Sequence, residues 1–96
     1  MRSIVSDEYE FVIGVDTHAA RHSFAVVAAA TGAVLDHALF PTSPAGLSRG
    51  QSWIDRWTAG ATTLVVVEGM GSFGAILTER LVAARRTVVE AARMPA

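Results

Sequence analysis

The hydrophobic positions of this chain fall into short runs separated by turn-forming and polar residues. Runs of four to eight apolar residues, rich in Val, Ile, Phe and Thr, are typical of β-strands. The pair Thr31-Gly32 predicts a two-residue turn between the second and third runs, so the chain is expected to begin with an antiparallel meander. The runs that predict strands are 11–15, 24–30, 34–40, 62–67 and 87–90.

Two segments between the later runs predict helices. Ser43 followed by Pro44 is a favourable helix start, because a serine can cap the first turn and proline fits its first position. Helically spaced apolar residues carry this helix to about Thr58. A second helix is expected from Ser72. Its predicted buried stripe consists of Phe73, Ile76, Leu77, Leu81 and Ala84.

The predicted order, β-β-β-α-β-α-β, indicates an α/β fold with a mixed sheet. A right-handed crossover through the first helix would pair the fourth strand parallel to the first. This is the ribonuclease H-like (RuvC-like) arrangement, here expected to be truncated after the fifth strand. Residues 1–10 are polar and acidic and are expected to form a flexible lead-in, which leaves 11–96 as the domain.

Composition narrows the classes of function. The chain has 96 residues, 51% of them hydrophobic, and a formal net charge of −1, so a broad basic surface for nucleic acid is not expected. The absence of cysteine excludes disulfides and thiolate metal sites. The first ten residues do not resemble a signal peptide, and no apolar run approaches the roughly 20 residues needed to span a bilayer. We expect a cytoplasmic protein without membrane association.

Two acidic residues end predicted strands. Asp16 follows the run 11–15, and Glu68 follows the run 62–67. If these strands are parallel neighbours, both carboxylates lie at the same edge of the sheet, where open α/β sheets bind ligands. Paired carboxylates repel each other unless a proton or a cation lies between them, and oxygen ligands suit Mg²⁺. The alternative is that each acid simply caps a strand end.

Three neighbouring polar residues accompany Asp16. Thr17, His18 and His22 lie in or next to the turn after the first strand, where they could contact phosphate or orient Asp16. No third ligand stands nearby to complete a zinc site.

A glycine-rich segment follows Glu68. Gly69, Gly71 and Gly74 match a G-x-G-x-x-G pattern between a strand and a helix, and Glu90, which ends the next strand, could be the acidic ribose partner of a dinucleotide site. Dinucleotide binding is one interpretation, although three strands precede the pattern and no second half follows it. The other is a tight turn with close helix packing.

The segments VIGVDTHAARHSFAVV, TGAVLDHALFPTSPAGLSRGQSWI and LVVVEGMGSFGAILTERLVAARRTVVE resemble the N-terminal domain of the DEDD transposases, insertion-sequence recombinases related to RuvC-type resolvases. The resemblance covers about Phe11 to Glu90. It implies that Asp16 and Glu68 are two of four acidic ligands of a two-metal Mg²⁺ site for DNA strand cleavage and exchange. It further implies DNA and a structured guide RNA as partners, and a homo-oligomer when the protein is full length.

The last two acids of the family, both aspartates, have no match before Ala96, so we expect the isolated chain to be inactive. Two alternatives stay open. One is a non-catalytic nucleic-acid-binding or dimerising remnant. The other is a fragment of an actin-like ATPase, although the segment after Asp16 lacks the glycine that such proteins use to cradle phosphate.

Overall fold

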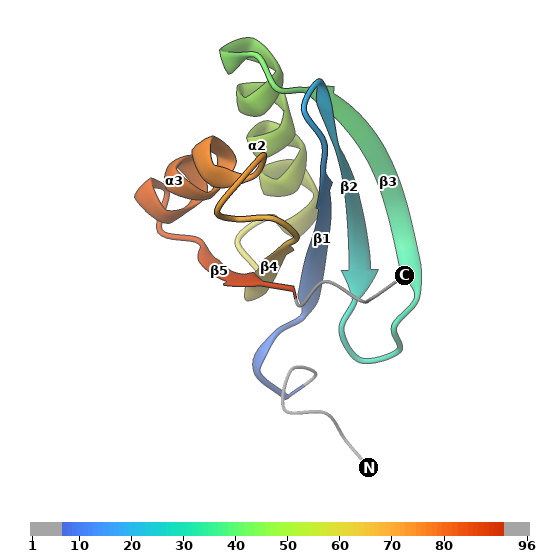
Figure 1. The fold of residues 1–96 in the computed structure, drawn as a ribbon. Helices are drawn as coiled ribbons and strands as arrows, with labels where there is room; N and C mark the ends of the chain where they lie inside the picture. The colour runs from blue at the N-terminus through green and yellow to red at the C-terminus, as the bar shows by residue number, and fades with distance from the viewer. Residues whose placement is uncertain (1–6, 92–96) are drawn as a thin grey trace, which may run out of the picture.

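A computed structural model describes residues 7–91, which form a mixed five-stranded sheet with two helices on one of its faces (Figure 1). The predicted order of elements is confirmed. The elements are β1 (Phe11–Thr17), β2 (Arg21–Ala28), β3 (Val34–Pro41), α2 (Pro44–Thr58), β4 (Thr63–Val67), α3 (Ala75–Ala83) and β5 (Thr87–Glu90).

The sheet has the strand order β3-β2-β1-β4-β5. β1 pairs antiparallel with β2, and β2 with β3, which confirms the meander. β4 then crosses over to lie parallel to β1, and β5 lies parallel to β4. The chain is therefore an α/β protein whose central strand, β1, has an antiparallel neighbour on one side and a parallel neighbour on the other.

Two details of the meander differ from prediction. The turn between β2 and β3 is not a two-residue turn but a loop over 29–33, in which the carbonyl of Ala28 accepts the amides of Thr31 and Gly32. β1 and β2 also extend further toward each other than expected, since Thr17 pairs with His22. Thr17 and His22 can extend the ladder although they are polar, because the side chains of both are buried on the core side of the sheet.

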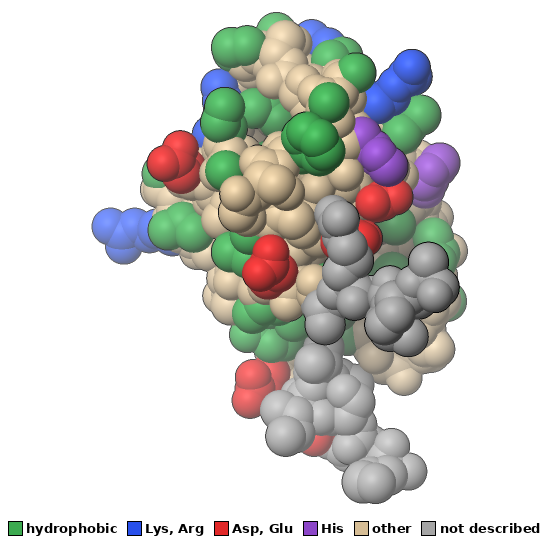
Figure 2. Space-filling model, viewed as in Figure 1, with side chains coloured by type: hydrophobic (Ala, Val, Ile, Leu, Met, Phe, Trp, Pro, Cys, Tyr) green, Lys and Arg blue, Asp and Glu red, His purple; other side chains and the backbone are tan. Residues whose placement is uncertain are grey.

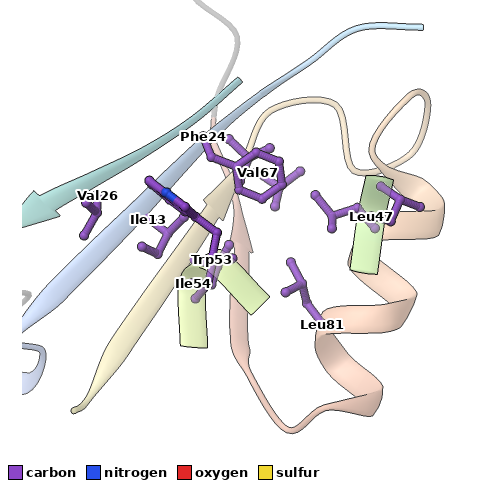
Figure 3. Close-up of a cluster of buried hydrophobic side chains, with 11 residues drawn as sticks. Ile13, Phe24, Val26, Leu47, Trp53, Ile54, Val67 and Leu81 are labelled. Atoms are coloured by element: carbon purple, nitrogen blue, oxygen red, sulfur yellow. The ribbon is translucent and has the colours of Figure 1, made fainter. Parts of the chain in front are cut away.

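The hydrophobic core lies between the sheet and the two helices. In α2, the Ser43 hydroxyl accepts the amide of Gly46, as the predicted cap requires. Trp53 of this helix packs edge-on against Phe24 and Phe40, with ring centroids 6.3 and 6.2 Å away. Figure 3 shows side chains of both helices and of the central strands meeting in this layer. The buried cluster comprises Ile13, Val15, Phe24, Val26, Leu47, Trp53, Ile54, Val65, Val67, Leu77 and Leu81.

Helix α3 begins three residues later than predicted. The carbonyl of Gly69 accepts the amides of Ser72 and Gly74, which holds this segment in turns until the helix starts at Ala75. As a result Phe73 and Ile76 are exposed, at 57% and 63%, and the prediction that they are buried is wrong. Leu77 and Leu81 are buried as expected.

The face of the sheet that the helices do not cover carries the candidate site. Along β2 the buried residues alternate with more accessible ones, so Arg21, Ser23 and Ala25 point away from the helices. Gly14 and Asp16 of β1 share that face, which no helix in the described part of the chain covers. We call this surface the open face of the sheet.

The remaining expectations concern the ends of the chain and the membrane. Residues 1–6 of the predicted lead-in lie outside the described residues. Glu10, its last residue, donates its amide to the carbonyl of Thr62 at 2.9 Å, next to the first pair of β1 and β4. Between residues 7 and 91, no helix has both the length and the apolar character needed to cross a membrane.

Candidate functional site

The two predicted acids lie at the ends of neighbouring strands, Asp16 as the penultimate residue of β1 and Glu68 as the residue after β4. Val15 and Val67 are partners in the parallel ladder, and the amide of Glu68 continues it by donating to the carbonyl of Val15 at 3.0 Å. Asp16 and Glu68, each one residue further on, therefore lie next to each other in register at the same edge of the sheet. This confirms the predicted placement of the strands, although a place at one edge does not by itself assign a function to the acids.

Both side chains line one hollow of about 310 Å³ on the open face. Small residues make it possible, because Gly14 has no side chain and a Cβ built there would meet no atom within 4 Å. Figure 2 shows acidic and histidine side chains next to one another on the right of the view. The hollow is lined by Gly14, Val15, Asp16, Ser23, Ala25, Val66, Glu68 and Ala91.

The carboxylate of Asp16 is oriented by a histidine. His18 Nε2 lies 3.2 Å from Asp16 Oδ2, and both side chains are more than half exposed. A proton on Nε2 makes this contact a hydrogen bond in either charge state of the ring. One carboxylate oxygen is thereby engaged, while the group stays accessible from the open face.

Two buried polar residues lie beneath the acids, on the helix side of the sheet. Thr17 is 5% exposed, and its hydroxyl donates to the carbonyl of Glu68 at 2.6 Å. His22 is 1% exposed, and its Nδ1 accepts the amide of His18 at 3.3 Å. Burial, and then the charge of His18, lower the pKa of His22 below its usual value, which favours the neutral ring that such an acceptor requires.

Phosphate contact and orientation of Asp16 were the roles expected of Thr17, His18 and His22, and the burial of each side chain distinguishes between these roles. Thr17 and His22 are in place to orient the backbone rather than to meet a phosphate from solvent. His18 is accessible and already contacts Asp16. The amide of His18 is also committed to His22, so it is not available to cradle a nucleotide phosphate as an ATPase turn would require.

The glycine-rich segment after Glu68 packs against the site. Gly69 has a φ of 74°, a left-handed conformation that glycine adopts without strain. A Cβ on Gly74 would lie 2.9 Å from the Gly69 carbonyl oxygen and 3.1 Å from Thr17 Cγ2, so only glycine allows this close approach. The geometry supports the interpretation of a tight turn with close packing.

The same segment offers little to a dinucleotide. The amides of Ser72 and Gly74 donate to Gly69, and the amide of Met70 donates to the Glu90 carboxylate at 2.9 Å. A pyrophosphate needs such amides to be available, and the Glu90 carboxylate, the candidate ribose partner, instead closes the turn.

Sequence reasoning missed part of the open face. Ser23 lines the hollow, and Arg21 lies on the same face, two residues earlier in β2. Among the arginines that the structure describes, Arg21 alone lies on a strand, and no hydrogen bond or ion pair engages its guanidinium group. Alternation from a correctly placed start of β2 would have put both residues beside Asp16, but the strand was expected to start at Phe24.

No family model matches this chain, and no curated protein matches its sequence.

The site as described supplies two carboxylates. Within residues 7–91, no cluster of three or more His, Asp or Glu side chains is arranged to hold a metal ion. Two acidic oxygen donors on one face suit a hard cation, which can complete its coordination with water. The residues present therefore fit Mg²⁺ as a partial ligand set and offer no thiolate or histidine cluster to a softer metal.

Proposed function

We propose that this chain is the N-terminal part of a ribonuclease H-like catalytic domain of the DEDD transposase type, and that it contributes Asp16 and Glu68 to Mg²⁺-dependent cleavage and exchange of DNA strands. The arrangement of the sheet supports the proposal, because a three-stranded meander followed by parallel β4 and β5 is the topology expected of that fold. The resemblance in sequence supports it independently.

One observation carries the assignment of the acids. Parallel pairing of Val15 with Val67 brings Asp16 and Glu68 to the same edge, where both line one open hollow. The register alone puts the two acids on one face. A cation site is favoured because a divalent ion would relieve the repulsion between two carboxylates that line one hollow.

Asp16 and Glu68 would hold the ion, and His18 would orient Asp16 through Oδ2. Bound Mg²⁺ would stabilise the charge that develops on the oxygens of a phosphodiester during its displacement. The residues of the chain fix the position of the carboxylates, and the small side chains of the hollow leave room for the substrate strand.

Arg21 is a described residue that brings a cationic group to the open face. It lies diagonally across the β1–β2 pair from Asp16, whose direct partner is Ser23, and diagonal neighbours are about 7–8 Å apart at their Cα atoms. An arginine at that range can neutralise a phosphate of a strand whose backbone passes over the two acids. Glu79, which is exposed on α3, lies outside this face and serves as a control.

The test is a titration of the whole chain with metal ion, in which NMR of the ¹⁵N-labelled protein monitors binding. We expect weak binding of Mg²⁺ or Mn²⁺, with signal changes centred on the amides of Asp16 and Glu68. Asp16→Asn and Glu68→Gln should each abolish it, and Glu79→Gln should leave it unchanged. Tight binding, or binding that survives both site variants, would contradict the proposal.

A nuclease assay completes the test. With two of the four family acids, the chain should not cleave branched or duplex DNA in Mg²⁺ or Mn²⁺ above an Asp16→Asn, Glu68→Gln control. Cleavage that disappears in the control would show that the chain completes its site by another route, for instance by self-association.

A non-catalytic alternative has one feature in its favour. β3 is an edge strand that exposes three large apolar side chains, Val34, Leu35 and Leu39. Exposed apolar edges of this kind pair with other strands. Sedimentation analysis and the metal titration together distinguish the two functions. A dimerising remnant should self-associate through β3 in sedimentation and should bind no cation at Asp16 in the titration.

A further inference from the structure

We propose that His22 is a positioning residue for the two-carboxylate site: through its unprotonated Nδ1 it fixes the turn that carries His18, and so fixes the direction in which the Asp16 carboxylate points. This inference rests on the proposed function for its consequence, metal binding. Its geometric part concerns bonds within the chain and can be tested separately.

The surroundings of His22 are unusual for a histidine in a turn region. The ring is 1% exposed and lies on the helix side of β2, whereas His18 is accessible from the open face. A buried polar ring is costly unless it is hydrogen-bonded. In this structure Nδ1 accepts the His18 amide, so the ring must carry its proton on Nε2.

The bond holds the first residue of a short segment whose other end is held by Thr42, which donates its hydroxyl to the carbonyl of Ala19 and its amide to that of Ala20. Between Thr17 and Arg21 the chain reverses direction, and residues 18–20 are exposed. The His18 amide is the first backbone donor beyond the end of β1. When His22 accepts it, the backbone of His18 is tied to β2, and its ring lies within 3.2 Å of Asp16 Oδ2.

If His22 only filled space in the core, its hydrogen bond to the His18 amide would have no role. A buried leucine or valine at position 22 would fill the same space and would leave the His18 amide without its acceptor. The structure instead links three groups in series: His22 holds His18, and His18 holds Asp16. Residues that orient a ligand in this way commonly affect metal affinity about 10–100-fold when replaced.

Two variants separate the position of the acceptor from the presence of a polar side chain. Asparagine places its carbonyl oxygen near the position of Nδ1, and glutamine places it near that of Nε2. His22→Asn should therefore keep the bond to the His18 amide, and His22→Gln should lose it. Thr63→Val is the matched control, because it removes a buried hydroxyl on the same face at the other end of β4.

The first measurement is the bond itself. In ¹⁵N-labelled wild-type protein, a coupling across the hydrogen bond should join the His18 amide nitrogen to His22 Nδ1, and long-range ring spectra should show the proton on Nε2. A proton on Nδ1 would overturn the proposal. The His18 ring should show a hydrogen bond to Asp16 in the wild type and in His22→Asn, and should lose it in His22→Gln.

The second measurement is the affinity for Mn²⁺, determined from the paramagnetic broadening of NMR signals near the site. We expect His22→Gln to weaken binding about tenfold, and His22→Asn and Thr63→Val to stay within about threefold of the wild type. Equal affinity in His22→Gln and the wild type, or an equal loss in both His22 variants while both remain folded, would overturn the proposal. If the wild type binds no Mn²⁺, the proposed function fails, and the His18–Asp16 contact in the two variants still decides the positioning role.

Discussion

Replacing Thr17 by valine tests the bond that joins the two acid-bearing strands. The hydroxyl of Thr17 donates to the carbonyl of Glu68 at 2.6 Å from a side chain that is 5% exposed. Valine has nearly the same shape, so packing against the core should be preserved while this one donor is lost. The substitution therefore reports on the hydrogen bond rather than on a cavity.

The magnitude follows from the burial of the pair. A typical intramolecular hydrogen bond contributes about 0.5–1.5 kcal/mol, and removing a donor from a buried acceptor raises the cost to as much as about 3 kcal/mol. Because the Glu68 carbonyl lies at a partly buried strand end, we expect the free energy of unfolding to fall by about 1–2 kcal/mol. In a domain of this size that lowers the melting temperature by roughly 5–10 °C.

Urea unfolding measures the change, with Thr78→Val as the control. The Thr78 hydroxyl also donates to a carbonyl, that of Gly74, at 2.8 Å, but this carbonyl keeps the amide of Thr78 as a second donor. The control should therefore cost less than about 0.5 kcal/mol. Hydrogen exchange of the Glu68 amide should accelerate in Thr17→Val alone. Equal losses of stability in the two variants, without a change in that exchange, would refute the reasoning.

Three further substitutions test other parts of the structure. Arg85 has a φ of 64° just after α3, so Arg85→Gly should raise the free energy of unfolding by about 0.5–1 kcal/mol, and a loss in urea unfolding would contradict the strain. Burial lowers the pKa of His22 in the folded state, so the unfolded chain takes up the proton first as the pH falls. The free energy of unfolding should therefore be highest above about pH 6.5, decline below that value and level off below the folded-state pKa. Urea titrations from pH 8 to 5 should show this slope reduced in His22→Asn, and an identical slope would contradict the assignment. Gly14→Val fills open space in a strand, so it should maintain or raise stability by up to about 1 kcal/mol while it weakens Mn²⁺ binding; unchanged binding would argue against a site in the hollow.

The sequence predicted those elements whose signals are local. Ser43 and Pro44 mark the start of α2, and β5 occupies the predicted Thr87–Glu90 because a β-branched run there stands between polar residues. The start of α3 was missed because it depends on the Gly69 carbonyl, which gathers two amides from further along the chain. Such a bond has no signature in hydrophobic periodicity.

The site divides in a similar way. Asp16 and Glu68 were predicted to lie at one edge because each ends an apolar run and because a right-handed crossover makes those runs parallel. Arg21 and Ser23 were missed because the polar stretch before Phe24 looked like a loop. In the structure that stretch is strand, since the buried ring of His22 replaces the apolar residue that periodicity requires.

The alternation of a β-strand explains why the polar residues around Asp16 have two different tasks. Asp16 faces the open side, so Thr17 must face the core, and across the ladder His22 faces the core while Ser23 faces the open side. A strand that ends leaves backbone groups without ladder partners, and buried ones must find them elsewhere. The two core-facing side chains meet this need, since Thr17 serves the Glu68 carbonyl and His22 serves the His18 amide. The acids can therefore lie on the open face while the backbone that carries them is held from behind, which is the rigidity that a metal-binding pair requires.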